Sequence, residues 1–240
     1  MSASLHEHTS IFDRSGALAA PSWRDLLGEG RALLQAHLRR PRVEVGPVPR
    51  GDGHPVIVLP AFFCSDAMTR GFRDWLTVLG YAVAGWGGGL NLGPTEAAVA
   101  AVDRLLQYSA QIYGRPASLV GVSLGGVLAR ALANAHPERV RRVITVCSPF
   151  RLPTASPLEP LYRALAPLHR SERLLLAQLT APPPVPTVAI YTPHDGVVAW
   201  RSCIDEPEPD RENIAIHGAH TTMLANPRAL QAIAERLARP

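Results

Sequence analysis

Short runs of apolar residues alternate with helical patterns along most of the chain. The runs are continuous and rich in valine, isoleucine and leucine: 56–59, 81–86, 118–122, 140–146, 185–191 and 214–217. Helical patterns follow most of them, at 65–79, about 94–113, 123–136 and about 221–237. Strands buried on both faces show such continuous runs, and βαβ units supply the helices that cover them. The pattern predicts an α/β fold, with a mostly parallel sheet of about six strands flanked by helices.

A further helical pattern precedes the first run. Ser22 can cap it, and Pro41 stops it. Its large apolar residues fall roughly on one face: Trp23, Leu26, Leu27, Leu33, Leu34 and Leu38. We expect 1–45 to form an N-terminal extension whose helix carries no chemistry and packs on the outside of a domain formed by 46–240.

Residues 148–184 interrupt the alternation. The segment is too long for an ordinary connection, and it is apolar with helical spacing in its first half. Leucines continue through its second half: Leu168, Leu174, Leu175, Leu176 and Leu179. An insertion after the fourth predicted strand is typical of a cap or lid over a site. We expect substrate contacts from the cap and from the loop after the first strand, at Phe63, Leu158, Leu161, Tyr162 and Leu165.

The composition is that of one globular domain in a reducing compartment. The 240 residues can bury a sizeable core, and 47% are apolar and 18% charged. All 24 basic residues are arginines interleaved with acids, which indicates a solvated surface and no nucleic-acid site. The three cysteines, Cys64, Cys147 and Cys203, indicate free thiols, because their spacing matches neither a disulfide framework nor a zinc site.

The start of the chain has no pattern of an export signal. Residues 1–16 lack a basic segment followed by an apolar one. No apolar run approaches the roughly 18 residues that cross a bilayer. We therefore expect a cytoplasmic protein. The sequence neither indicates nor excludes membrane contact, and it leaves the oligomeric state open.

The clearest chemical signal is Gly-Val-Ser-Leu-Gly at 121–125. The motif G-x-S-x-G is short, but here it directly follows an apolar run and directly precedes a helical pattern. A strand–turn–helix context is the one in which this motif carries a nucleophilic serine. The serine sits in a strained turn, and Gly121 and Gly125 leave room for the turn to close. The motif predicts Ser123 as a nucleophile.

A serine hydroxyl needs a base, and the base needs an acid that orients it. Asp195 follows the fifth apolar run and His220 follows the sixth, so both lie at the same sheet edge as Ser123. We predict Asp195 as the acid and His220 as the base. Other candidates stay open: His194 and His217 as bases, and Asp205, Glu206, Glu208 and Asp210 as acids. These acids belong to a proline-broken loop, which favours a solvated connection.

Acyl transfer also needs hydrogen-bond donors for the oxyanion that develops on the substrate. One predicted donor is the backbone N–H of Leu124, directly after the nucleophile. The other is the backbone N–H of Phe62, in the loop that follows the first predicted strand.

Five segments together resemble the α/β-hydrolase superfamily, and most of all its bacterial esterase- and lipase-like branch. They are VIVLPAFF, LVGVSLGG, HPERVRRVITVCSP, PTVAIYTPHDGVV and GAHTTMLANPRALQAIAERL, and they run from about Gly51 to the C-terminus. The resemblance implies the α/β-hydrolase fold, a Ser-His-acid triad and two oxyanion N–H groups at the five residues predicted above. The chain departs from many members in two places. Pro60-Ala61 replaces a frequent His-Gly, and Val43–Val45 is the one further strand candidate upstream.

The expected function is hydrolysis of a small-molecule carboxylic ester with a hydrophobic acyl group, through an acyl-enzyme on Ser123. No metal or organic cofactor is implied, since the chain has neither a dinucleotide-binding nor a phosphate-binding glycine motif. Two alternatives remain. The same triad serves acyltransferases and thioesterases, and a catalytically silent protein of this fold could bind a ligand.

Overall fold

A computed structural model describes residues 18–39, 45–152, 154–169 and 181–240. Six parallel strands form one sheet in the order β2-β1-β3-β4-β5-β6. The strands are β1 (Pro55–Leu59), β2 (Ala82–Gly85), β3 (Ala117–Val122), β4 (Val140–Val146), β5 (Thr187–Tyr191) and β6 (Arg211–Ala215). The predicted α/β architecture is confirmed, with strand ends shifted by a few residues at β5 and β6.

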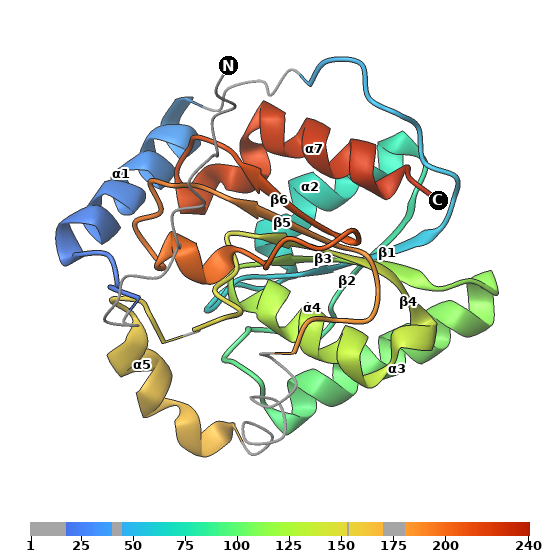
Figure 1. Ribbon diagram of the computed structural model, residues 1–240, viewed down its shortest axis with the longest axis horizontal. Helices are drawn as coiled ribbons and strands as arrows, with labels where there is room; N and C mark the ends of the chain where they lie inside the picture. The colour runs from blue at the N-terminus through green and yellow to red at the C-terminus, as the bar shows by residue number, and fades with distance from the viewer. Residues whose placement is uncertain (1–17, 40–44, 153, 170–180) are drawn as a thin grey trace, which may run out of the picture.

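Helices cover both faces of the sheet (Figure 1). The α-helices in the described part of the chain are α1 (Trp23–Arg39), α2 (Asp66–Leu79), α3 (Glu96–Tyr113), α4 (Leu124–Ala135), α5 (Glu159–Ala164) and α7 (Pro227–Leu237). Along β1, Val56 and Val58 pack with α2 and α7, whereas Ile57 and Leu59 pack with α3 and α4. Successive side chains of a strand point to opposite faces, so continuous apolar runs fill two cores at once. None of the described helices is long and apolar enough to cross a membrane.

The strand order reverses beside β1. β2 lies on one side of β1, and β3 to β6 follow one another on the other side. In open parallel sheets, ligands bind outside the carboxyl ends of the strands at such a switch point. The loop after β1 and the turn after β3 therefore meet where a site is expected.

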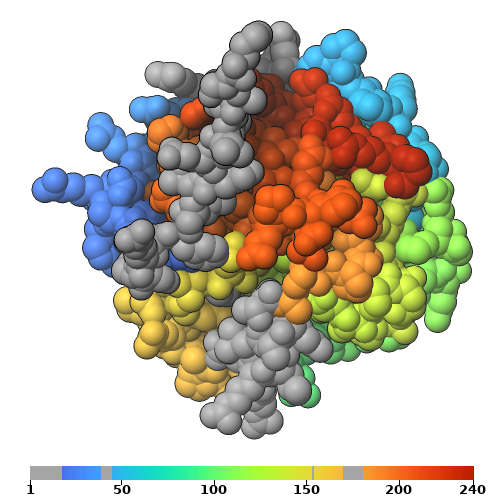
Figure 2. Space-filling view, in the orientation of Figure 1, coloured from blue at the N-terminus to red at the C-terminus, as the bar shows by residue number. Residues whose placement is uncertain are grey.

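The N-terminal helix α1 presents a different face from the one expected. Four of its large apolar side chains are between 58% and 72% exposed: Trp23, Leu27, Leu34 and Leu38. Only Leu26 of the expected face packs with Val197 and Val198, beyond the end of β5. Figure 2 shows α1 at the rim of the molecule, with side chains projecting outward. Its inner face instead carries a buried acid, Glu29.

The expected cap is described in its first half. It contains α5 and a short 3-10 turn, η2 (Ala166–Leu168). The four leucines between 174 and 179 lie outside the described residues, as do Val43 and Glu44 of the strand candidate. Val45 lies in no strand. The domain boundaries and the role of 148–184 as a cap stay predictions.

Candidate active site

Ser123 occupies the sharp turn between β3 and α4. Its φ of 50° and ψ of −122° lie outside the regions that residues with a side chain ordinarily adopt. Its N–H donates to the carbonyl of Val146 at 2.8 Å, which ties the turn to the end of β4. Such strain persists only where the surroundings enforce it, and it is the conformation that the serine motif predicts.

Two glycines let this turn pack closely. A Cβ on Gly121 would lie 2.3 Å from the Cα of Gly126, and a Cβ on Gly125 would lie 2.4 Å from the carbonyl oxygen of Leu59. Both distances are far inside van der Waals contact. Glycine at 125 therefore lets the first turn of α4 lie directly against the loop that follows β1.

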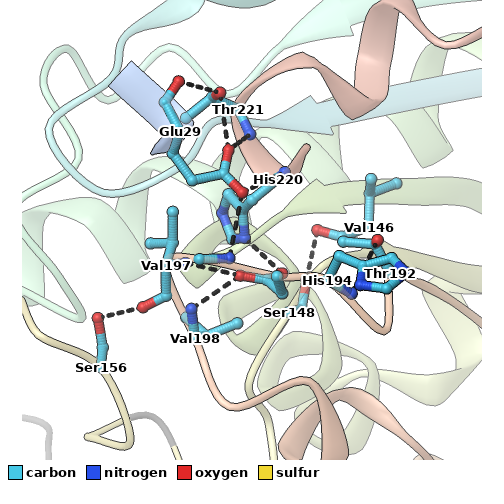
Figure 3. Close-up of polar contacts among 12 residues, drawn as sticks. Glu29, Val146, Ser148, Ser156, Thr192, His194, Val197, Val198, His220 and Thr221 are labelled. Carbon is cyan, nitrogen blue, oxygen red and sulfur yellow. Dashed lines mark hydrogen bonds and ion pairs between the residues drawn. The ribbon is translucent and has the colours of Figure 1, made fainter. Parts of the chain in front are cut away.

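Asp195 and His220 meet in a buried hydrogen bond. The Oδ2 of Asp195 lies 2.8 Å from the Nδ1 of His220. The Oδ1 of Asp195 accepts the backbone N–H groups of Val197 and Val198 at 2.9 and 2.8 Å, which fixes the carboxylate (Figure 3). Because the contact with Asp195 uses Nδ1, Nε2 is the ring nitrogen of His220 that does not contact this carboxylate.

The other candidate bases lie apart from this pair. His194 and His217 are exposed, and their rings pack against each other with centroids 5.3 Å apart. Neither is hydrogen-bonded to Asp195 through its ring among the described residues. Of the three histidines considered, the structure brings His220 to the acid.

The other candidate acids are also accounted for. Asp205 is buried and forms a bidentate ion pair with Arg130, whose Nη1 and Nη2 donate to Oδ2 and Oδ1 at 2.6 and 2.7 Å. The expectation of a wholly solvated acidic loop is therefore wrong at this position. The remaining three acids are exposed: Glu206, Glu208 and Asp210.

A residue that the sequence reasoning missed, Asn91, holds the loop after β1. Its Nδ2 donates to the carbonyl of Pro60 at 2.7 Å, and its backbone N–H donates to Cys64 at 2.9 Å. Its own carbonyl accepts the N–H of Phe63 at 2.8 Å. Asn91 is almost fully buried, so it shapes the loop from within. A lone polar residue in the glycine-rich stretch GGGLNLG was the available signal.

The two predicted oxyanion donors are the backbone N–H groups of Phe62, in the loop after β1, and Leu124, at the start of α4. Among the described residues, no hydrogen bond uses the backbone N–H of Phe62. Leu124 is the first residue of α4, and the first N–H groups of a helix have no partner within it. In the part of the chain that the structure describes, neither N–H group therefore has a protein acceptor.

A small hollow lies beside the turn that follows β3. Its lining is mostly apolar: Asn91, Gly93, Pro94, Leu124, Val127, Leu128 and Tyr162. Of the predicted substrate contacts, Tyr162 lines it. Phe63 packs edge-on against Phe62, Leu161 is 45% exposed, Leu165 is half-buried, and Leu158 packs with the cluster around Val197.

Cys147 completes a buried group with the acid and the base. One ligand atom each of Cys147, Asp195 and His220 lies within 4.8 Å of the others. Burial, reinforced by the negative charge of Asp195, raises the pKa of the Cys147 thiol well above its ordinary value. A raised thiol pKa favours the neutral S–H form beside the carboxylate of Asp195.

Glu29 reaches the same region from α1, where the sequence predicted no chemistry. Its carboxylate accepts the backbone N–H groups of Gly196, His220 and Thr221 at 3.1, 2.9 and 3.0 Å (Figure 3). Its position three residues after Leu26 places an acid on the inner face of the helix, which was the signal in the sequence.

Comparisons with known proteins agree with this fold. The model of a family described as alpha/beta hydrolase fold matches residues 93–186. No curated protein matches the chain. A structure of the metagenome-derived lipolytic enzymes LipS and LipT is 17% identical, with a TM-score of 0.58, and covers 80% of this chain and 97% of its own.

Two further structures are similar in the same way. The monoacylglycerol lipase of Paleococcus ferrophilus is 14% identical, with a TM-score of 0.57, and covers 79% of this chain and 96% of its own. An esterase of Exiguobacterium antarcticum is 14% identical, with a TM-score of 0.53, and the match covers 79% of this chain and 93% of the esterase. At this identity the similarity concerns the fold. From the sheet order, the turn at Ser123 and these matches, we conclude that the chain has the α/β-hydrolase fold.

Proposed function

We propose that this protein is a serine hydrolase that cleaves carboxylic esters, with Ser123 as nucleophile, His220 as base and Asp195 as the acid that orients the base. The observation that carries the proposal is the 2.8 Å hydrogen bond between Asp195 and His220, at the sheet edge where Ser123 is held in its strained turn. A buried acid, an oriented imidazole and a strained serine are the parts that acyl transfer to serine requires.

The proposed reaction runs in two halves. The Oγ of Ser123 attacks the ester carbonyl carbon while Nε2 of His220 takes its proton, and the oxyanion accepts the N–H groups of Phe62 and Leu124. The imidazolium, stabilised by Asp195, then protonates the departing alkoxide and leaves an acyl-serine. Water gives a proton to His220, attacks the acyl carbon, and the acid leaves as Ser123 regains its proton.

The apolar hollow supports an ester with a hydrophobic acyl group. Five of its seven lining residues are apolar, namely Pro94, Leu124, Val127, Leu128 and Tyr162, and Leu124 directly follows the nucleophile. An apolar lining next to the residue that follows Ser123 favours a hydrocarbon chain over a charged group. Lipolytic enzymes and esterases are among the structural neighbours, which is consistent with this substrate class. Acyl transfer to an alcohol or cleavage of a thioester would use the same triad.

Labelling with a fluorophosphonate probe, read by intact mass, tests the proposal. Wild type should gain one adduct, Ser123→Ala none, and His220→Ala should react about 10²–10⁴-fold more slowly. His217→Ala is the matched control, because this exposed histidine lies three residues away and should not alter the rate. A folded wild type that stays unlabelled would favour the silent binding protein instead.

A further inference from the structure

Glu29 is a buried carboxylate that contacts the loops of both the proposed acid and the proposed base. It is 4% exposed and comes from α1, far from either loop in the sequence. Its Oε1 accepts the N–H of Gly196 at 3.1 Å and the N–H of His220 at 2.9 Å. Its Oε2 accepts the N–H and the hydroxyl of Thr221, both at 3.0 Å.

The contacts suit an ionised carboxylate and no neutral group of the same shape. A carboxylate only accepts hydrogen bonds, and here four donors meet its two oxygens. Burial of such a charge is costly unless hydrogen bonds compensate it, and these four donors do so. In either orientation of its amide, a glutamine would instead place an NH₂ group against a backbone N–H donor.

The side chain of Glu29 contacts both loops. Gly196 directly follows Asp195, so a hydrogen bond to its N–H restrains the backbone of the proposed acid. The N–H of His220 belongs to the proposed base itself. The fit is close on the helix side as well, since a Cβ on Gly196 would lie 2.6 Å from the carbonyl of Asp25. Glu29 therefore fixes the spacing of the acid and base loops without touching either functional side chain.

We propose that Glu29 is a positioning residue that clamps the loop after β5 to the start of η4 (His220–Ala225), and so holds His220 in register with Asp195. The inference rests on the proposed function for its kinetic consequence, but its structural consequence does not depend on turnover. It also gives α1 a purpose: a helix whose apolar side chains mostly face outward is held to the domain through a polar contact at the site.

Steady-state kinetics with a p-nitrophenyl ester form the first arm of the test. Misplacement of a reacting group by about 1 Å can cost on the order of 10²-fold, so Glu29→Ala should lower kcat by about that factor. KM should change little, because α1 lines no part of the hollow. Glu29→Gln, which keeps the contacts of one oxygen, should fall between Glu29→Ala and wild type.

Asp25→Asn is the matched control, because Asp25 is an exposed acid on the same helix and its carboxylate, among the residues that the structure describes, is hydrogen-bonded to Ser22 alone. It should keep the kcat of wild type. A folded Glu29→Ala with an unchanged kcat, or an equal loss in Asp25→Asn, would overturn the proposal.

The second arm needs no substrate. In protein labelled with ¹⁵N-histidine, the Nδ1–H of His220 bound to Asp195 should give a downfield proton resonance, assigned by its loss in His220→Gln. Glu29→Ala and Glu29→Gln should shift or broaden it, whereas Asp25→Asn should not. If wild type cleaves no ester, the proposed function fails while this resonance still decides the role of Glu29. Should Glu29→Ala fail to fold, the isosteric Glu29→Gln decides it, and an unmoved resonance there overturns the clamp.

Discussion

Strand β3 has a serine at each end, and each belongs to a set of serine, histidine and aspartate. At the carboxyl end Ser123 shares the sheet edge with His220 and Asp195. At the amino end the Oγ of Ser118 lies 2.9 Å from Nε2 of His54, whose Nδ1 contacts Asp52 at 2.5 Å. Judged by residue types and hydrogen-bond order alone, the amino-end set is the more complete of the two.

Backbone and surroundings separate the two sets. Ser118 lies within a fully buried strand, and His54 is fully buried with the ring of Tyr81 packed edge-on against it. No helix begins at Ser118, whereas Ser123 sits at φ 50° directly before α4. A reactive serine needs a route for substrate and donors for an oxyanion, so the amino-end set is a structural network.

The largest contrast should come from the two aspartates. Asp195→Asn should lower kcat/KM about 10⁴-fold, because the amide no longer orients the imidazole or stabilises imidazolium. Asp52→Asn should leave ester hydrolysis unchanged and lower the melting temperature. Hydrogen bonds from His54 and Arg115 hold the pKa of Asp52 well below its usual value, outweighing the opposing effect of burial. Steady-state kinetics and thermal unfolding of both variants test this difference. A loss of kcat/KM in Asp52→Asn as large as that in Asp195→Asn would contradict it.

A second contrast concerns the loop after β1. Asn91→Ala removes the hydrogen bond to Pro60 and loosens the turn that carries Phe62. Loss of one oxyanion donor typically costs about 10²–10³-fold, and an indirect displacement should cost less, about 10-fold. Asn226→Ala is the control: its side chain caps α7 and contacts His217, away from this loop. A lowered kcat in Asn91→Ala alone, with KM little changed, is the expected result.

Ser118→Ala should act on stability alone. Removing the hydroxyl leaves Nε2 of the fully buried His54 without its partner, and an unsatisfied buried group costs about 1–3 kcal/mol. Urea unfolding should show that loss, while the fluorophosphonate labelling rate stays that of wild type. Slower labelling in Ser118→Ala would mean that the two ends of β3 are coupled.

The residues at the carboxyl edge of the sheet could be located from the sequence because the ends of the strands that precede them could be predicted. Continuous apolar runs mark buried strands, and loops after parallel strands share one edge, so Ser123, Asp195 and His220 were placed at that edge without knowledge of any contact. Strand β6 was placed three residues late, since its residues are half-exposed and more polar than the runs that mark central strands.

Contacts between distant segments could not be placed in this way. Glu29 lies 191 residues from His220, and helical periodicity tells only that it shares a face with Leu26. That periodicity also predicted the wrong inner face for α1. An apolar stripe shows which side chains share a face of a helix, but it does not show which surface of the protein that face contacts. The hydrogen bonds of Asn91 and His54 likewise depend on how loops cross the sheet edges, which no local pattern encodes.

The smallest expected difference is in pH dependence, and it concerns the amino-end set. Burial lowers the pKa of His54 below its usual 6.5, outweighing the hydrogen bond and charge of Asp52, which raise it. The unfolded chain therefore binds a proton near pH 6.5 that the native state does not, so the free energy of unfolding falls as pH drops below that value. For one proton the slope is at most about 1.4 kcal/mol per pH unit. Urea unfolding between pH 8 and 5.5 should show this decline.

The non-titrating variant His54→Gln isolates the contribution of His54 to that decline. His54→Gln should be less stable than wild type at pH 8. The free energies of unfolding of the two should converge as pH falls, because only wild type has a buried histidine at this position whose protonation opposes folding. His217→Gln, at an exposed histidine of the carboxyl edge, should follow the curve of wild type. Parallel curves for wild type and His54→Gln would show that His54 takes up a proton as readily in the folded protein as in the unfolded chain. The amino-end set would then be open to solvent, and burial could no longer be what distinguishes it from the set at Ser123.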